Sequence, residues 1–466
     1  MQMQEILLHE TNWLGSNLIF YNTVTGSYDK NINNVFLSED AELDSDGFDS
    51  YVKYGFSVFG DTPIKNVKFT LPNTKLLKKP SGELQLQRLP DPILEILGNQ
   101  TSEALALDRI EAWVEGFHKR TSEESILGVL PLSGGLDSRL LAYFSKNSSN
   151  LHAFSYGISL SQNRSSEVRI GKKVAESMGL KWQQIHIGEF HQFLNLNNQV
   201  YGPSTHAHSM YHFEFYSKIK NLLGLNVRAE VLSGIYGDVW AGSWKFPSIL
   251  EPGGLKNLAV THGIEASQFL ADTSNVVSEK ENLYFEESRE QLKDPLYRVI
   301  AAARLKVMLL RHLIETPKSL GFEAASPFLD LEIAASMLTI NPNRRRDRAW
   351  QRDFLEKNCP LGQKGKRGRN SMNVSDMYGA MMIQLPTLSS NRLTPKKISK
   401  IDTEEISRKV QIGKIKFFMD FLAQTRIVGA LNYKLKFIKN SFMTSYADYV
   451  IMYPIMSVFG TVRERK

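Results

Sequence analysis

The residues with the clearest chemical potential form the string SGGLDS, from Ser133 to Ser138. A glycine pair brings backbone N–H groups close to a ligand, and serine hydroxyls add further donors, which together suit a phosphate. Asp137 would repel that phosphate unless a cation lay between them. Mg²⁺ bound to a polyphosphate supplies such a cation. The string therefore predicts a polyphosphate site with Asp137 on the metal side.

The segments around this string predict how it is positioned. The apolar run Ile126–Leu132 is typical of a short buried strand. From Leu136 onward, apolar residues recur at helical spacing through Phe144. Strand, glycine turn and helix start would aim backbone N–H groups and the positive end of a helix dipole at one point. The plain alternative is a strand-to-helix turn with a capping serine, but the full six-residue string favours nucleotide binding.

Further strands and helices follow in alternation. His152–Gly157 and Trp182–Ile187 are expected to be strands, and Ser166–Met178 a helix. This alternation predicts a parallel α/β sheet with ligands at the carboxyl ends of its strands. From about residue 250 the chain is expected to be mostly helical, with one helix over Arg298–Ile314 and another over Leu331–Leu338.

The N-terminal segment has a different character. Residues 1–95 lack helical periodicity and contain many turn pairs, so we expect them to be β-rich, with a hairpin over Lys75–Gln87. Leu89–Thr101, with two prolines, is the expected junction. Two domains are therefore predicted, residues 1–95 and 100–466, as the length of 466 residues also favours.

A second predicted loop has the same sequence pattern as the first. The buried run Glu230–Leu232 leads into SGIYGDVWAGSW, from Ser233 to Trp244. Its Ser-Gly turn and Asp238 would complement the first loop, so that Asp137 and Asp238 together hold Mg²⁺-pyrophosphate. Gly-Asp turns are common, and the second loop is informative only beside the first.

Composition limits the possible cellular compartment and the possible partners. The single cysteine, Cys359, excludes intramolecular disulfides and zinc-cysteine sites and fits a reducing cytoplasm. No apolar stretch approaches the roughly 20 residues that span a bilayer, and the N-terminus lacks the pattern of a secretory signal. A net charge of +7 fits an acidic partner such as nucleic acid, an anionic substrate or a membrane surface, without choosing among them.

Together these motifs resemble a known family. SGGLDS resembles the pyrophosphate loop of the N-type ATP pyrophosphatases, and the second loop with SPFLD (Ser326–Asp330) is similar to the synthetase domain of asparagine synthetase-like enzymes. The resemblance implies an adenine-nucleotide-hydrolase-like synthetase domain over residues 100–466. It also implies a β-rich N-terminal domain like the nucleophile hydrolases, and a helical C-terminal part. ATP and Mg²⁺ are the implied cofactors. The implied ATP-binding residues are Leu132, Ser133, Gly134, Gly135, Asp137, Ser138, Tyr156, Ser233, Gly234 and Asp238.

Three departures from the family pattern bear on the reaction. Gln2 stands where glutamine-dependent members expose a cysteine nucleophile, so residues 1–95 would be a degenerate amidotransferase-like domain that releases no ammonia. Ile235 replaces a glutamate in the second loop, and Ala325 replaces an arginine before PFLD. These changes argue against asparagine synthesis itself.

The β-lactam synthetases resemble this chain at the same positions. The resemblance implies that Tyr236 and Glu323 form a general-base pair; the alternative is that Tyr236 packs under its loop and Glu323 pairs with an arginine. A catalytic lysine is implied within CPLGQKGKRGRN, as Lys366 or Lys364. The string HAHSMYH, with His206, His208 and His212, is expected to be ordinary polar packing rather than a metal site, with a role in acceptor binding as the alternative.

These features predict a cytoplasmic ligase that adenylates a carboxylate with ATP, releases pyrophosphate and forms an amide. The acid would be a small molecule, a peptide or a sugar. The amine would be ammonia, a partner-delivered amine or the substrate's own amino group, as in the lactam and macrolactam closures of β-lactam synthetases and lasso peptide cyclases. A protein partner supplying substrate is compatible with this. The alternatives are an RNA-modifying ATP pyrophosphatase, which the lone cysteine disfavours, and a non-catalytic nucleotide-binding subunit.

Overall fold

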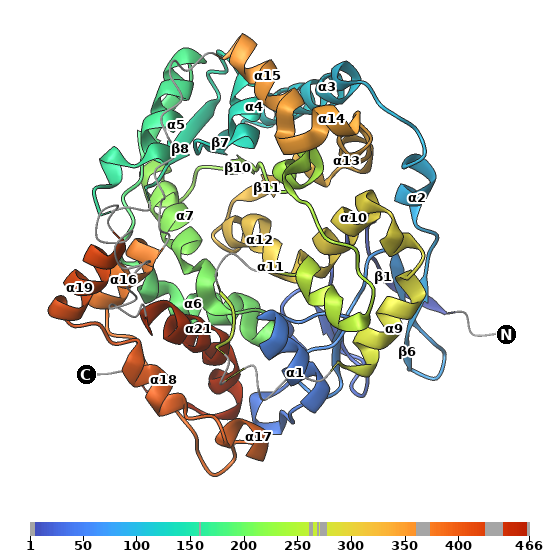
Figure 1. Ribbon diagram of the computed structural model, residues 1–466, viewed down its shortest axis with the longest axis vertical. Coiled ribbons are helices and arrows are strands. Elements are labelled where there is room, and N and C mark those ends of the chain that lie inside the picture. The colour runs from blue at the N-terminus through green and yellow to red at the C-terminus, as the bar shows by residue number, and fades with distance from the viewer. Residues whose placement is uncertain are drawn as a thin grey trace.

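The fold is built around a parallel sheet of five strands in the order β11-β10-β7-β8-β9. The structure is a computed structural model and describes residues 5–157, 160–260, 264–267, 270, 277–359, 373–424 and 441–463. The sheet lies in the upper half of Figure 1. Its strands are β7 (Leu127–Pro131), β8 (Leu151–Ser155), β9 (Lys181–Gln184), β10 (Ala229–Leu232) and β11 (Glu323–Ala325). The predicted parallel α/β sheet is confirmed.

Alternate residues of the strands pack on opposite faces of this sheet. Val129 of β7 packs in a cluster with Phe215, whereas its neighbour Leu130 packs with Val114. Such alternation follows from the period of two in a strand and requires both faces to be covered. One face carries α3 (Glu103–Glu123), α4 (Leu136–Phe144) and α5 (Ser166–Ser177), and the other carries α7 (Met210–Leu223).

The predicted helix over residues 298–314 is wrong as a single element. It is divided into α10 (Pro295–Leu305), α11 (Val307–Leu310) and α12 (His312–Ser319). Lys306 ends α10 and precedes α11, with φ −88° and ψ 2°, outside the helical range. The break therefore places Lys306 at a helix junction. The helix predicted at Leu331–Leu338 is confirmed as α13 (Leu331–Leu338).

The N-terminal residues form two small antiparallel sheets, β1-β5-β6 and β3-β2-β4. The predicted hairpin is present, with Leu76 of β5 opposite Leu86 of β6. The sequence of this segment indicated no helical periodicity, and this was wrong. Helix α1 (Ser45–Tyr54) lies here, capped by the Asp44 side chain. The strands are β1 (Ile6–Glu10), β2 (Phe20–Asn22), β3 (Tyr28–Asp29), β4 (Val67–Phe69), β5 (Thr74–Lys78) and β6 (Leu84–Arg88).

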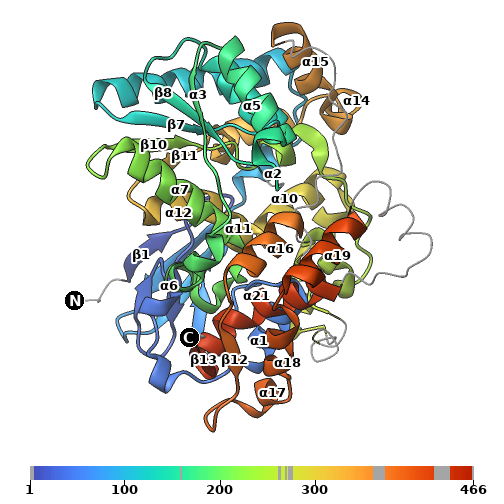
Figure 2. The ribbon, with the colours of Figure 1, turned by 90° about the vertical axis from the view of Figure 1, so that its left-hand side faces the viewer.

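The C-terminal helices pack against these N-terminal elements in the lower half of Figure 2. Residues 18–69 and α21 (Ser441–Phe459) share one apolar cluster, within which the Tyr51 hydroxyl donates to the carbonyl of Ile451 at 3.0 Å. Among the described residues, no helix combines the length and apolarity needed to cross a membrane. The remaining elements are α2 (Pro92–Ile96), α6 (Leu194–Tyr201), α9 (Glu279–Ser288), α14 (Pro342–Arg345), α15 (Ala349–Asn358), α16 (Asn373–Met382), α17 (Lys396–Ser399), α18 (Thr403–Lys409), α19 (Lys414–Gln424), β12 (Thr387–Ser389) and β13 (Thr461–Arg463).

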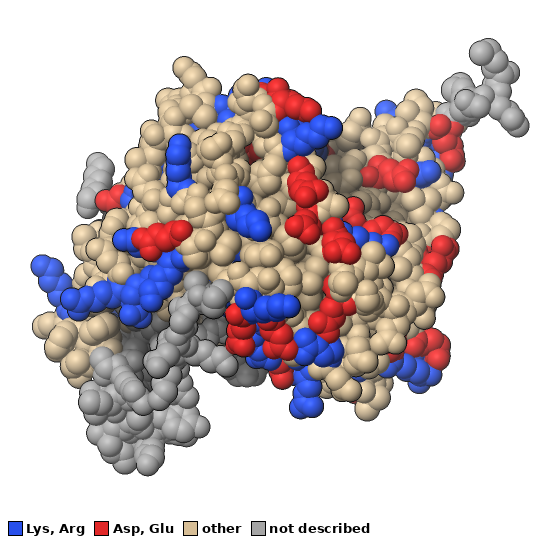
Figure 3. Space-filling model, turned by 90° about the horizontal axis from the view of Figure 1, so that it is seen from above, with Lys and Arg blue, Asp and Glu red and all other residues tan. Residues whose placement is uncertain are grey.

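Charged side chains of both signs are mixed over the face shown in Figure 3, apart from a run of Lys and Arg along one edge. The excess of basic residues, 56 Lys and Arg against 49 Asp and Glu, thus forms no single basic surface on that face.

Candidate functional site

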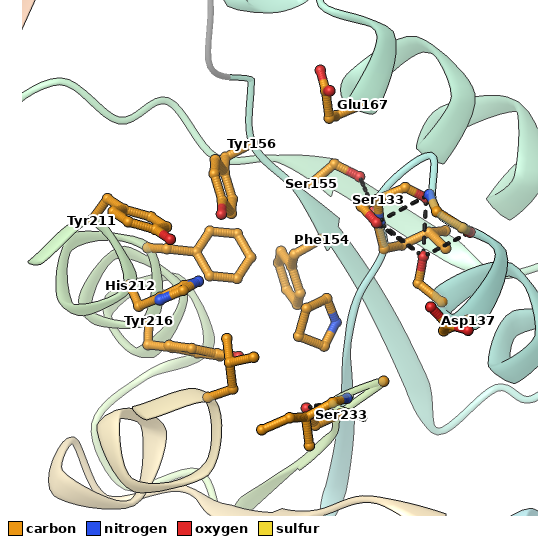
Figure 4. A pocket seen from close by; sticks show the side chains of 18 of the residues that line it. Ser133, Asp137, Phe154, Ser155, Tyr156, Glu167, Tyr211, His212, Tyr216 and Ser233 are labelled. Atoms are coloured by element: carbon orange, nitrogen blue, oxygen red, sulfur yellow. Dashed lines mark hydrogen bonds between the residues drawn. The ribbon is translucent and has the colours of Figure 1, made fainter. Parts of the chain in front are cut away.

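The two loops meet because the strands that carry them are neighbours. β7 pairs with β8 on one side and with β10 on the other, so the strand order changes direction at β7. Ligands of open α/β sheets bind at the carboxyl ends of the strands at such a point. A cavity of about 480 Å³ lies there, lined by both loops. Figure 4 shows it between Ser133 and Asp137 on one side and Tyr211, His212 and Tyr216 on the other.

The first loop is held by its own serines. The Ser138 hydroxyl donates to the Ser133 carbonyl at 3.1 Å and accepts from the Ser133 backbone N–H at 3.2 Å. The Ser133 hydroxyl in turn accepts from Gly135 N–H at 3.2 Å. No side chain caps the N-terminus of α4. The first N–H groups of this helix therefore stay available to an anion, as the sequence predicts.

Glycines let the second loop approach the first very closely. A Cβ added to Gly237 would lie 2.8 Å from the carboxyl carbon of Asp137, and one on Gly234 would lie 3.5 Å from its Cβ. Burial and, after it, the negative charge of Asp238 raise the pKa of Asp137 to about 6. The two carboxylates are thus close enough to repel each other, as expected of a pair that shares a cation.

The second loop is fixed by aromatic anchors. The Trp240 indole donates to the carbonyl of Phe328 at 2.8 Å, and the Trp350 indole donates to that of Ala241 at 3.1 Å. Ser233 N–H donates to the carbonyl of Ala325 at 2.8 Å, which ties the loop to β11. Trp240 therefore packs in the core, and the loop keeps Asp238 at the cavity wall.

Most of the predicted ATP-binding residues line this one cavity. They are Leu132, Ser133, Gly135, Asp137, Ser138, Tyr156, Ser233, Gly234 and Asp238. Gly134 does not line it; this glycine faces α5, where an added Cβ would lie 3.1 Å from the Ile170 side chain. Apart from Gly134, which serves helix packing, the residues that the resemblance implied thus lie around one cavity, and their binding of ATP stays a prediction.

The histidines of HAHSMYH are buried. His208 and His212 line the cavity, and the His212 ring lies 4.9 Å from that of His312. Burial lowers the pKa of His206 and His212 well below the usual value. The part of the chain that the structure describes contains no group of three His, Cys, Asp or Glu side chains arranged to hold a metal.

The structure does not bring Tyr236 and Glu323 together. The Tyr236 ring stacks on Trp240 at 5.6 Å, and its buried hydroxyl has no hydrogen-bond partner among the described residues. Glu323 begins β11, opposite Glu230, and its carboxylate lies 3.6 Å from Arg228. It therefore lies toward the strand end remote from the cavity. This arrangement contradicts a general-base pair and agrees with the alternative of packing and an arginine partner.

The predicted catalytic lysines, Lys364 and Lys366, lie outside the described residues. Two cations that the sequence reasoning missed lie beside the loops. The Lys306 ammonium lies 3.9 Å from the centre of the Trp244 ring, and burial lowers the pKa of this lysine to about 8. The lysine in the largely apolar run AAARLKVMLL was the available signal.

Arg348 is the second missed cation. Its guanidinium lies 3.3 Å from the Asp137 carboxylate, and both side chains are only 15% exposed. Gln351 donates to the other oxygen of Asp137 at 2.9 Å. By its sequence alone the motif RRRDR (Arg344–Arg348) predicts a solvated helix start, and the contact with Asp137 corrects this for Arg348. Arg348 reaches Asp137 because Asp347 and Arg348 both adopt positive φ, 52° and 58°, directly before α15.

Comparison with known proteins agrees with this geometry. No curated protein matches the chain. The family model described as asparagine synthase matches residues 114–220, which include the first loop, β8, α5 and most of α7. The match supports an ATP-dependent synthetase of the C–N ligase class. Residues 114–220 are therefore similar to the asparagine synthase family.

Proposed function

We propose that this enzyme adenylates a substrate carboxylate and then forms an amide. A carboxylate oxygen would attack the α-phosphorus of ATP, and the α–β bond would break to release pyrophosphate. An amine nitrogen would then attack the acyl carbon, with AMP leaving. The observation that carries this proposal is the convergence of two strand-to-helix loops, with Asp137 and Asp238, in one cavity.

The residues present fit ATP with Mg²⁺. The uncapped start of α4 and the loop serines offer donors to phosphate oxygens. Asp137 and Asp238 would hold the metal. The negative charge of Asp238 contributes, after burial, to the raised pKa of Asp137, and a cation between the two carboxylates would relieve this repulsion. Bound Mg²⁺ supplies charge neutralisation for the leaving pyrophosphate. We propose that Leu132 and Tyr156 border the adenine.

The chain also offers cations for the negative charge that develops on oxygen in both steps. Lys306 lies buried beside Trp244 and is attracted electrostatically to Asp238. Arg348 positions Asp137 through their ion pair. We propose Lys306 as the buried catalytic cation, and Lys366 or Lys364, which the family resemblance of the sequence implies, as a second one.

The amine is not expected to come from glutamine. Cys359, the sole cysteine of the sequence, is 3% exposed and packs near Ser177, in the cluster around α4 and α5. Residues 1–95 would then be an amidotransferase-like domain without its nucleophile, attached to a synthetase domain of residues 100–466. The amine is ammonia, a partner-delivered amine or the acid substrate's own amino group, and the acid is a small molecule, peptide or sugar in the cytoplasm.

Product analysis tests the proposal. Purified protein is incubated with ATP, Mg²⁺, a panel of carboxylic acids and an amine such as ammonia, and the nucleotide products are separated by chromatography. AMP and pyrophosphate in equal amounts are expected. Asp137→Asn and Asp238→Asn should each abolish their formation without loss of fold. ADP with phosphate as the products would overturn the mechanism.

A further inference from the structure

One end of the cavity has no task in the binding of ATP phosphates. Across from the two loops it is walled by Tyr211, Phe215 and Tyr216. Tyr156, which also borders the proposed adenine site, packs beside these rings, and Figure 4 shows the three tyrosines. Tyr156 packs against Phe215 with ring centres 5.0 Å apart and against Tyr211 at 6.1 Å. The last wall is α16, which contributes Asp376. We call this region the aromatic end.

Asp376 is an uncompensated acid. It is 4% exposed, and its Oδ2 atom is buried with no hydrogen-bond partner among the described residues. Burial raises the pKa of this carboxyl to about 8. A buried carboxylate without a partner is costly, so its presence at a cavity wall points to a ligand that compensates it.

Among the described residues, the groups that face Asp376 supply no positive charge. Tyr211 and Tyr446 interact with it electrostatically, and burial raises the pKa of both phenols. His191, which contacts α16 at Gly379 and bonds to the Tyr446 hydroxyl at 2.8 Å, has its pKa lowered by burial to about 4. His208 and His212 line the same end, and burial keeps His212 neutral.

The described lining of the whole cavity is acidic. Its four carboxylates belong to Asp137, Glu167, Asp238 and Asp376, and it includes no Lys or Arg. Asp137 and Asp238 belong to the phosphate loops, and Glu167 lies above Tyr156 in Figure 4. Asp376 interacts electrostatically with Tyr211, and Glu167 interacts in the same way with Tyr156. Aromatic faces attract organic cations, and a buried carboxylate adds the counter-charge.

We propose that the aromatic end binds the ammonium group of a primary alkylamine substrate, with Asp376 as its counter-ion. The inference rests on the proposed function, because it assigns the amine that this function requires. It narrows that amine from free ammonia to an alkylamine, whose chain would cover the rings. A carboxylate or phosphate would find no Lys or Arg in the described lining.

Calorimetry with n-pentylamine as the probe tests this binding without turnover. We expect pentylammonium to bind the full-length protein at least tenfold more tightly than it binds Asp376→Asn, whereas neutral 1-pentanol should not distinguish the two. When no ligand is bound, Asp376 is mostly protonated at neutral pH, so the binding of pentylammonium at pH 7 should release about one proton. The release is measured from the heats of binding in buffers of different ionisation enthalpy. Asp376→Asn should release none.

Asp448→Asn is the matched control, because Asp448 is also a buried acid but accepts from Ser267 N–H at 2.7 Å and does not line the cavity. Its affinity for pentylamine should equal that of the unmodified protein. Equal affinity in Asp376→Asn, or binding without proton release, would overturn the inference. Proton release is measured on the unmodified protein, so this arm holds even if a variant fails to fold.

The two proposals fail separately. AMP and pyrophosphate formation without Asp376-dependent amine binding would remove only the amine site. Asp376-dependent binding in a protein that makes no AMP would leave the site and remove the proposed reaction.

Discussion

Gly237 lies so close to Asp137 that any side chain at residue 237 would displace the carboxylate. The distances from an added Cβ to Asp137 Cγ, Cβ and Oδ1 are 2.8, 2.9 and 2.9 Å. This contact joins the two loops of the site. A single methyl group added at residue 237 therefore tests the predicted phosphate-binding site.

Gly237→Ala should therefore lower pyrophosphate release by about tenfold or more, because relief of the overlap moves Asp137 at a cost of about 1–3 kcal/mol. The measurement is the rate of pyrophosphate release with saturating acid. Gly234→Ala is the milder comparison, since its added Cβ would meet Asp137 at an ordinary 3.5 Å. An equal loss in both variants would contradict this account.

Lys306 should impose an alkaline limit on the reaction. Its pKa is lowered to about 8, so its positive charge is present below that pH and is lost above it. Pyrophosphate formation, followed from pH 6.5 to 9.5, should fall on the alkaline side. Lys306→Arg should move this fall in rate to higher pH because a guanidinium keeps its charge. Lys306→Met should lose about 100-fold below pH 8, and the difference from the unmodified enzyme should shrink above that pH. A profile unchanged in Lys306→Arg would remove the lysine from the reaction.

Glu323→Gln should leave the rate within about twofold of the unmodified enzyme, because an exposed ion pair contributes little. The side chain is 55% exposed and faces Arg228. Tyr236→Phe removes only an unpartnered hydroxyl and should keep the stack on Trp240. Steady-state rates of both variants test whether Tyr236 and Glu323 act together as a general base. A large loss of rate in each variant, with no further loss in the double variant, would support that pair.

The Arg304–Asp91 ion pair should stabilise the junction between the N-terminal segment and α10. Its atoms approach to 2.5 Å, the side chains are 11% and 17% exposed, and Arg304 also donates to the carbonyl of Trp13. Asp91→Ala should lower the free energy of unfolding by about 3–5 kcal/mol, because it leaves a buried guanidinium uncompensated.

Denaturant titration measures that loss. Glu290→Ala breaks the exposed pair with Lys293 and should leave the unfolding midpoint unchanged. Similar effects of the two substitutions would contradict a special role for the buried pair.

The sequence predicted the two loops well because their signals are local. SGGLDS follows an apolar run and opens a helix within one short segment, and the second loop repeats the pattern. The sheet order then follows from the strand-helix alternation. The missed helix α1 carries Phe48, Tyr51 and Val52 at helical spacing, a signal hidden by the aspartates and glycine among them.

The rest of the site depends on contacts between distant segments. Arg348 reaches Asp137 across 211 positions, and Asp376 reaches the aromatic rings of α7 only through the fold. Lys306 is distinguished by burial, which no spacing reveals. Glu323 was misjudged because adjacency to PFLD in the sequence says nothing of which end of the strand a residue occupies.

The cluster that residues 18–69 share with α21 has a consequence for biosynthesis. Tyr51 and Ile451 are 400 positions apart, so the earlier segment leaves the ribosome long before its packing partner exists. Contacts of such sequence separation close slowly and expose apolar surface in the meantime. We expect nascent chains released before residue 441 to need chaperone protection, with Phe48 and Tyr51 left in water. The segment that is made early is thus among the last to be buried.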